Sequence, residues 1–590
     1  MPSPQDSESR AGQRARVDDL SISLVRGMPL RDEPGMGSLT IPGFLRDVCS
    51  RYAEREALVI HHADRVERWS YQDLWDHSVE VARALIASGV GKDSRVGILM
   101  TNRPEYLSLL FGTAMAGGVS VSLSTFSTAT ELEHLVTVSG ISTLLFEDRV
   151  LNRDFAAMLL ELEPGLAAGA PGELASVKFP FLQQLVCLDG VTGVEPGEDS
   201  GHRAVSDIAA IESWSAFLAR AGHIPVEMVA ARAAVVTPAD AGGLFFSSGT
   251  TSLPKGILHA QRAFAIQWWR WPRVMAVKEP GRAWTGNGFF WSGNISMIVG
   301  VALATGGAVI LQPLFDAGAA LNLIEAERVN FLNGRPHQWA RLQAVPGYMA
   351  ADLSSLRYIT RGELIMEHPT VNTDWVLPMS FGTTETMTIN TSYDADTPAA
   401  QYAGSAGVPL PGNLLKIVDP QTHALVPVGA RGEICIKGPT LMMGYIGKTP
   451  EEALDDEGYF CTGDGGYVDE QGRLFWEGRL NDIIKTGGAN VSPQEVDEVL
   501  ATYPGVKRSQ TVGVPHETLS EMVVSCIVPL EGVTLDEREL IAYLKQRLAS
   551  YKIPREILLF AEHDFALTDN EKAKVGEIRQ LAARRLGVGQ

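Results

Sequence analysis

The sequence has few cysteines and lacks the close cysteine pairs that hold metals or small disulfide scaffolds. Its 590 residues include five cysteines, and none of them forms a C-x-x-C pair: Cys49, Cys187, Cys435, Cys461 and Cys526. Small secreted domains and structural zinc sites need a denser pattern than this. We therefore expect no disulfide scaffold and no zinc site, and we expect a protein of the reducing cytoplasm.

Positive charge is also scarce. The chain has 50 Lys and Arg residues against 70 Asp and Glu residues, so its net charge at pH 7 is 50 − 70 = −20. A surface of this sign repels the phosphates of nucleic acids and the headgroups of anionic membranes. The composition predicts neither of these as a partner.

Long hydrophobic runs are missing as well. Residues 1–19 lack the apolar centre of a secretory signal, and we expect a disordered arm there. The uncharged stretch 283–315 is interrupted by asparagines, a glycine pair and Gln312-Pro313. A buried helix, a glycine turn and the short strand 308–311 explain it better than a membrane span does. The sequence predicts a soluble protein without a transmembrane segment.

What the sequence does have is an alternation of helix and strand patterns, starting near Thr40. The stretch 71–90 places apolar residues on one helical face, 95–100 is a short apolar strand, and 104–118 is the next helix. This order predicts an α/β fold with parallel sheets covered by helices. Residues 163–205 are rich in Gly, Pro and acidic residues, and we interpret them as a surface excursion.

The length requires more than one domain. Beyond about residue 480 the pattern changes to a capped helix, two strands and an amphipathic helix, which predicts a small α+β unit. We predict a disordered arm over 1–37, a large domain over 38–480 and a small, mobile domain over 481–590.

Four short motifs carry the chemistry, and they follow one another in order along the chain. They are "FFSSGTTSLPKG" (245–256), "SFGTTET" (380–386), "YFCTGDGG" (459–466) and "GRLNDIIKTGGANVSPQE" (478–495). Taken singly, each is typical of an ordinary loop, turn or capped helix start. Glycines and hydroxyls in the first motif also suit close contact with phosphates, although Lys255 does not stand where the P-loop lysine stands.

In this order, and with a lysine near the C-terminus, the motifs resemble those of the adenylate-forming superfamily, and most closely those of acyl-CoA synthetases. The resemblance covers the chain from about residue 40 to its end. It implies that ATP and a carboxylic acid form an acyl-adenylate with release of pyrophosphate. The first motif would hold the β- and γ-phosphates of Mg-ATP through these residues: Ser247, Ser248, Gly249, Thr250, Thr251 and Lys255.

The resemblance assigns roles to the next two motifs. Thr384 would contact the α-phosphate, and Glu385 would hold Mg²⁺, a cation that prefers carboxylate oxygens. Asp464 would accept hydrogen bonds from both ribose hydroxyls, and Arg479 would lie near the ribose and phosphate. The adenine would pack beside Phe381, and the segment 361–364 would line the same slot.

The C-terminal lysine is Lys572 in the ungapped alignment, with Lys574 as the weaker candidate and Glu571 where the family has glycine. Its cation would bridge the attacking carboxylate and the α-phosphate and so stabilise the transition state. The small domain would then rotate about a hinge at Asn481. Gly487 and Gly488 would leave room for the pantetheine arm of coenzyme A.

The acid is expected to lack an α-amine, because Trp291 stands where amino-acid-activating relatives place an aspartate. A buried ammonium without a carboxylate partner would be costly. Phe289, Phe290 and Trp291 suggest a pocket for an apolar or aromatic acid. The tryptophans upstream, at 268, 269 and 271, could join this pocket, and all these rings could equally be ordinary core.

Coenzyme A is the expected acceptor, since no carrier module follows within the 590 residues. Transfer to a separate carrier protein, transfer to an amine, and a catalytically silent binding protein on the same scaffold stay as alternatives. A homodimer is also left open.

Overall fold

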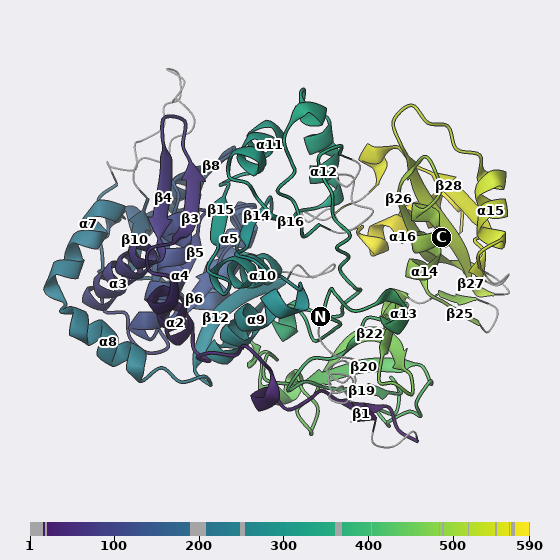
Figure 1. Ribbon diagram of the computed structural model, residues 1–590, viewed down its shortest axis with the longest axis horizontal. Coiled ribbons are helices and arrows are strands. Elements are labelled where there is room, and N and C mark those ends of the chain that lie inside the picture. Colours follow the sequence, from purple (N-terminus) through teal and green to yellow (C-terminus); the bar gives the residue numbers. More distant parts are fainter. Residues whose placement is uncertain are drawn as a thin grey trace, which may run out of the picture.

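Three sheets with their helices form the larger part of the molecule, and a further sheet of five strands lies toward the C-terminus (Figure 1). The computed structural model describes residues 16–17, 21–188, 208–247, 254–359, 368–402, 404–482, 484–486, 489–516, 519–548, 552–565, 567 and 573–588. The predicted α/β class with a small α+β C-terminal unit is confirmed.

The eight-stranded sheet is parallel through its centre and antiparallel at one edge. Its strand order is β11 (Ile211–Ser213), β10 (Gln184–Cys187), β7 (Thr143–Phe146), β5 (Arg95–Leu99), β6 (Val119–Ser122), β12 (Ala241–Ser247), β13 (Lys255–Ala260) and β21 (Gly444–Tyr445). Strand β10 lies within 163–205, so that stretch is not wholly a surface excursion. The four residues of this strand are all buried. The acidic and glycine-rich residues on either side of it dominated the sequence pattern, so the strand was not predicted.

A second sheet of five strands is parallel except for one hairpin. Its order is β16 (Phe331–Asn333), β14 (Arg282–Thr285), β15 (Ala308–Leu311), β3 (Glu56–His61) and β4 (Val66–Ser70). The predicted strand at 308–311 is therefore confirmed.

No helix in the described part of the chain is long and apolar enough to cross a membrane.

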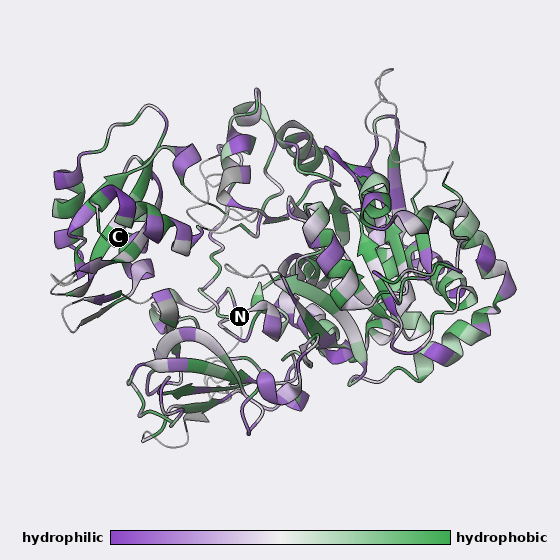
Figure 2. Cartoon of the chain, turned by 180° about the vertical axis from the view of Figure 1, so that it is seen from behind, coloured by the Kyte–Doolittle hydropathy of each residue, from purple (hydrophilic) through white to green (hydrophobic). Residues whose placement is uncertain are grey.

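A shared layer of helices packs between these two sheets. Apolar residues of the layer and of both facing sheets form one core, as Val96 of β5 and Val309 of β15 illustrate. Figure 2 shows hydrophobic residues gathered on the interior strands and many hydrophilic residues on the outer helices. The layer consists of α2 (Ile41–Tyr52), α3 (Tyr71–Ala87), α4 (Pro104–Ala116), α9 (Gln261–Val274) and α10 (Ser292–Leu303).

Two further hydrophobic cores lie between the outer faces of these sheets and the helices that cover them. Beneath the eight-stranded sheet lie α5 (Ala129–Ser139) and α6 (Phe155–Leu162), and over the five-stranded sheet lie α11 (Ala317–Ala326) and α12 (Pro336–Gln343). Both sheets are thus buried on two faces, as parallel sheets require.

The six-stranded sheet is antiparallel throughout and includes the N-terminal segment. Its order is β1 (Arg16–Val17), β2 (Leu24–Arg26), β19 (Leu414–Val418), β20 (Gly432–Lys437), β22 (Phe460–Val468) and β23 (Leu474–Arg479). The prediction of disorder over 1–37 is wrong for residues 21–37. Val25 is buried in this sheet, and the fully buried Glu33 forms an ion pair with the fully buried Arg270, Oε2 to Nη2 2.8 Å. The polar composition of the first residues hid the strand pattern that follows them.

The C-terminal unit is built on β25 (Ala489–Val491), β24 (Ile484–Thr486), β27 (Ser520–Pro529) and β26 (Val506–His516), with β28 (Glu556–Leu559) parallel to β27. Its helices are α14 (Pro493–Ala501), α15 (Glu537–Lys545) and α16 (Val575–Leu586). Ser492, at the start of α14, donates its hydroxyl to the carbonyl of Glu477 on β23, so the unit touches the six-stranded sheet.

Candidate active site

The first motif connects β12 to β13 at the antiparallel edge of the eight-stranded sheet. Ser247 and Lys255 face each other across the mouth of this connection. The Lys255 ammonium is exposed and lies 5.7 Å from the centre of the Tyr445 ring. Ser248, Gly249, Thr250 and Thr251 lie outside the described residues, as does the segment 361–364.

The second motif forms a tight turn that presents Thr384 and Glu385. A one-turn helix, η7 (Thr384–Thr386), ends at Met387 and Thr388, whose φ angles of 49° and 93° are left-handed. Such residues cost about 1–3 kcal/mol each and persist where the surroundings fix them. Only glycine fits at Gly382, because a Cβ there would stand 1.6 Å from the carbonyl oxygen of Thr388.

Glu385 is held from the neighbouring strand β21. Its Oε1 accepts a hydrogen bond of 2.8 Å from the Tyr445 hydroxyl, and its carbonyl oxygen accepts one of 2.7 Å from the Met442 N–H. Burial, followed by the charge of Glu385, raises the pKa of Tyr445 well above its ordinary value. The phenol therefore stays protonated and remains a donor.

The third motif places Asp464 opposite Arg479. The two residues are paired across β22 and β23, with Arg479 Nε 3.1 Å from Asp464 Oδ1. The Asp464 side chain is 4% exposed, and burial raises its pKa from 3.8 to about 6, while the charge of Arg479 opposes the rise. The nearby Glu385 adds to the rise, so the second and third motifs share one electrostatic environment. Phe381 packs into the core of the same sheet.

Asp464 lies in a β-bulge of β22, and a disulfide borders that bulge. Cys435 faces Cys461, whereas Glu433 faces Gly465, so β22 has extra residues between these pairings. Gly463 supplies the left-handed φ of 73° that the bulge needs, and its N–H donates to Glu433 Oε1 at 2.9 Å.

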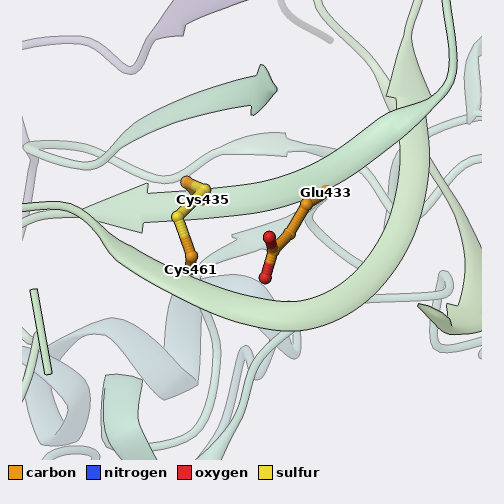
Figure 3. Close-up of side chains that lie close together, drawn as sticks. All are labelled: Glu433, Cys435 and Cys461. Carbon is orange, nitrogen blue, oxygen red and sulfur yellow. A yellow bond between two sulfur atoms is a disulfide. The ribbon is translucent and has the colours of Figure 1, made fainter. Parts of the chain in front are cut away.

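The disulfide itself joins Cys435 to Cys461, with the Glu433 carboxylate beside it (Figure 3). The sequence predicted no disulfide scaffold, yet this one pair is bonded, because antiparallel pairing of β20 and β22 brings together residues separated by 26 positions. Cys49, Cys187 and Cys526 are buried, and none of them forms a disulfide within the described part of the chain.

Only part of the aromatic segment 289–291, which follows β14, lines a pocket. Phe289 is buried in the core against Tyr106, with ring centres 5.6 Å apart. The tryptophans 268, 269 and 271 belong to the same core, on α9. Phe290 and Trp291 instead line a cavity of about 360 Å³. Its other walls include Phe126, Phe315, Gln338, Arg335 and Arg341.

Asn102 fixes the aromatic loop, and the sequence motifs did not reveal it. Its Oδ1 accepts from the Phe289 N–H and its Nδ2 donates to the Asn287 carbonyl, both at 2.8 Å. Asn102 follows β5 at the carboxyl end of a parallel strand, a position at which α/β sheets commonly place ligand-binding groups. That topological signal could have identified it. Tyr445 offers no such local signal.

The remaining predicted residues belong to the C-terminal unit. Lys572, Gly487 and Gly488 lie outside the described residues. The backbone of Asn481 lies in the short helix η9 (Leu480–Asp482), between β23 and β24. Lys574 occupies the position just before α16, and its Nζ lies 3.2 Å from Glu577 Oε1. The structure thus brings together Lys255, Glu385, Asp464 and Arg479 and leaves the C-terminal lysine a prediction.

The fold combines a large unit of helix-covered sheets with a small C-terminal unit, and the family models match both parts. Residues 45–446 match the family model of the AMP-binding enzyme, and residues 495–572 match the AMP-binding enzyme C-terminal domain. The chain belongs to the AMP-binding enzyme family, which confirms the resemblance seen in the motifs.

Known proteins similar to this chain include ligases of aromatic acids. An indoleacetate–CoA ligase from Aromatoleum aromaticum is 31% identical over 546 residues, which cover 91% of this chain and 95% of that protein. The crystal structure of the anthranilate CoA ligase AuaEII with anthranoyl-AMP has a TM-score of 0.73 at 22% identity, covering 95% of this chain and all of that one. The amide bond synthetase McbA from Marinactinospora thermotolerans has a TM-score of 0.67 at 24% identity, covering 92% and 99%. At these identities, the two structures support the fold alone.

Proposed function

We propose that this protein is an AMP-forming acid–thiol ligase. A carboxylate oxygen of the acid attacks the α-phosphorus of ATP, the bond to the β-phosphate oxygen breaks, and pyrophosphate leaves. The thiol of coenzyme A then attacks the carbonyl carbon of the acyl-adenylate, loses its proton and expels AMP. The observation that carries this proposal is the convergence of four charged groups, Glu385 from the turn η7 and Lys255, Asp464 and Arg479 from three different strands.

The nucleotide roles follow from the chemistry of these groups. Asp464 is a buried carboxylate whose paired oxygens suit the two ribose hydroxyls, and Arg479 keeps it ionised near neutral pH. Lys255, with the hydroxyls of the loop before it, would neutralise the β- and γ-phosphates, and Thr384 would contact the α-phosphate. Phe381 would pack against the adenine.

Magnesium fits the site through Glu385. One carboxylate oxygen accepts from Tyr445, which leaves the other for a hard cation that prefers oxygen ligands. Bound there with ATP, Mg²⁺ would neutralise phosphate charge during displacement of pyrophosphate. Glu385 would bind and orient the cation, and Tyr445 would hold Glu385.

The lysine and the hinge belong to the same proposal. Lys572 would bridge the acid and the α-phosphate, and rotation of residues 481–590 about Asn481 would remove it and bring Gly487 and Gly488 to the thiol path. The domain limits 38–480 and 481–590 are part of the proposal. Its support is the order of the motifs and the position of η9 between the six-stranded sheet and the C-terminal unit.

The acid would be apolar or aromatic and would lack an α-amine. The cavity beside Trp291 is walled by Phe126, Phe290 and Phe315, and no carboxylate is among the described residues that line it. Arg335 and Arg341, which also line the cavity, would repel an ammonium. The relative that acts on indoleacetate agrees with an aromatic acid.

Amine transfer is the second candidate, because an amide bond synthetase shares this fold. A carrier protein is a third candidate acceptor. A homodimer is a separate proposal about the oligomeric state. A cytoplasmic location is also part of the proposal, and the disulfide Cys435–Cys461 is the feature that speaks against it.

Exchange of labelled pyrophosphate into ATP tests the first half-reaction. We expect exchange that depends on an aryl or fatty acid and on Mg²⁺. Absence of exchange with every acid, in a protein that still binds ATP, would favour the silent scaffold.

A further inference from the structure

Strand β21 joins the phosphate-binding hairpin to the turn that carries Glu385. It pairs with β13, where Ile257 faces Tyr445 and Leu258 faces Gly444. The Met443 N–H donates to the Leu258 carbonyl at 2.7 Å, and the Ile446 N–H donates to the Gly256 carbonyl at 2.8 Å. This two-residue strand is therefore fixed immediately beyond the loop that ends at Lys255.

The side chain of Tyr445 contacts both proposed phosphate-binding elements. Its hydroxyl donates to Glu385 Oε1 at 2.8 Å, and its ring lies 5.7 Å from the Lys255 ammonium. The backbone of the same segment also holds the turn, through the Met442 N–H and the Glu385 carbonyl. A phenylalanine at 445 could pack in the same place, so packing alone does not account for the hydroxyl. Its hydrogen bond to Glu385 does.

We propose that Tyr445 is a positioning residue for the magnesium of Mg-ATP: its hydroxyl fixes one oxygen of Glu385 so that the other faces the cation. The proposal rests on the proposed role of Glu385. A glutamate without such a partner samples several rotamers, and ordering it on binding costs free energy. Partners that hydrogen-bond a ligating carboxylate fix its orientation, and losing one typically weakens metal binding or activity by about 10–100-fold.

The decisive variant is Tyr445→Phe, which removes only the hydroxyl. Tyr467→Phe is the matched control, because Tyr467 lies in the six-stranded sheet with its ring stacked on Phe475 at 4.8 Å. Glu385→Gln serves as the reference for loss of the ligand itself. Free Mn²⁺ is measured by electron paramagnetic resonance in the presence of protein and α,β-methylene-ATP, whose methylene bridge between the α- and β-phosphorus prevents transfer of the adenylyl group.

We expect the Mn²⁺ dissociation constant of Tyr445→Phe to rise about 10–100-fold, with Tyr467→Phe like wild type. The Mg²⁺ concentration for half-maximal pyrophosphate exchange should rise in parallel, and saturating Mg²⁺ should restore most of the rate. A merely packing role would not move this magnesium dependence.

Unchanged Mn²⁺ binding in Tyr445→Phe, together with weak binding in Glu385→Gln, would overturn the role of Tyr445 alone. An equal loss of rate at every Mg²⁺ concentration would also overturn it, since that outcome indicates a structural role. Normal Mn²⁺ binding in Glu385→Gln would overturn the metal role of Glu385 and the proposal with it. Absence of exchange in wild type would overturn the proposed function, while Mn²⁺ binding would still decide on Tyr445.

Discussion

Replacing Asp464 with asparagine should stabilise the protein and at the same time weaken ATP binding. Burial raises the pKa of Asp464 from 3.8 to about 6. Because a tenfold change in an ionisation constant corresponds to about 1.4 kcal/mol, holding this carboxylate ionised costs the folded protein roughly 3 kcal/mol. This value already includes the attraction of Arg479, whose side chain is 56% exposed and whose charge opposes the rise in the pKa of Asp464. We expect a gain of roughly 3 kcal/mol at pH 8.

The pH dependence identifies the cause. A carboxyl group whose pKa is higher in the folded protein than in the unfolded chain holds its proton longer in the folded state. Folding is therefore favoured below pH 4, and this advantage is lost as the pH rises from about 4 to 6. The difference in melting temperature between Asp464→Asn and wild type should be near zero at pH 4 and full above pH 7. Thermal unfolding across this range measures it.

ATP affinity provides the functional half of the test. Hydrogen bonds to a charged group contribute about 1.5–3 kcal/mol, so the loss should be at least about tenfold by calorimetry. A variant that is less stable than wild type at pH 8, or equally displaced at every pH, would refute the burial reasoning. Unchanged ATP affinity would refute the ribose role.

Three further substitutions test other elements. Lys572→Ala should slow adenylate formation by about 10²–10³-fold while a pre-made adenylate still forms thioester; if Lys574→Ala has this effect instead, the alignment is wrong by two residues. Gly488→Leu should spare pyrophosphate exchange and lower thioester formation, and equal loss of both would contradict the proposed thiol path. Cys461→Ser should lower the free energy of unfolding of the large domain by about 3.5 kcal/mol, the value for closing a loop of 26 residues, and unfolding in chemical denaturant with and without a thiol reductant checks it.

Local patterns predicted the helices and strands well, because their causes lie within a few residues. Helix α3 begins at a capping box in which Ser70 accepts from the Asp73 N–H and Asp73 accepts from the Ser70 N–H. Its buried face includes Leu74, Val81 and Leu85, which the 3.6-residue period placed together.

Contacts between distant segments could not be predicted in this way. The ion pair of Glu33 and Arg270 and the hydrogen bond of Tyr445 to Glu385 join residues that no periodicity connects. The disulfide depends on the register of β20 against β22, which the spacing of its cysteines does not reveal. The motifs identified the side chains of the candidate site. Which of these side chains lie close together depends on how the strands pair, and the sequence does not reveal that pairing.

Product analysis with coenzyme A present tests the ligase proposal most directly. The protein is incubated with ATP, Mg²⁺, coenzyme A and a panel of fatty, aryl and amino acids, and AMP and acyl-CoA are quantified by mass spectrometry. We predict equal amounts of AMP and acyl-CoA from an amine-free apolar or aromatic acid, since the cavity beside Trp291 is walled by rings and lined by no carboxylate among the described residues. Preference for a free amino acid would contradict the substrate assignment. An adenylate that accumulates despite coenzyme A, and is discharged only by a carrier protein or an amine, would contradict the acceptor.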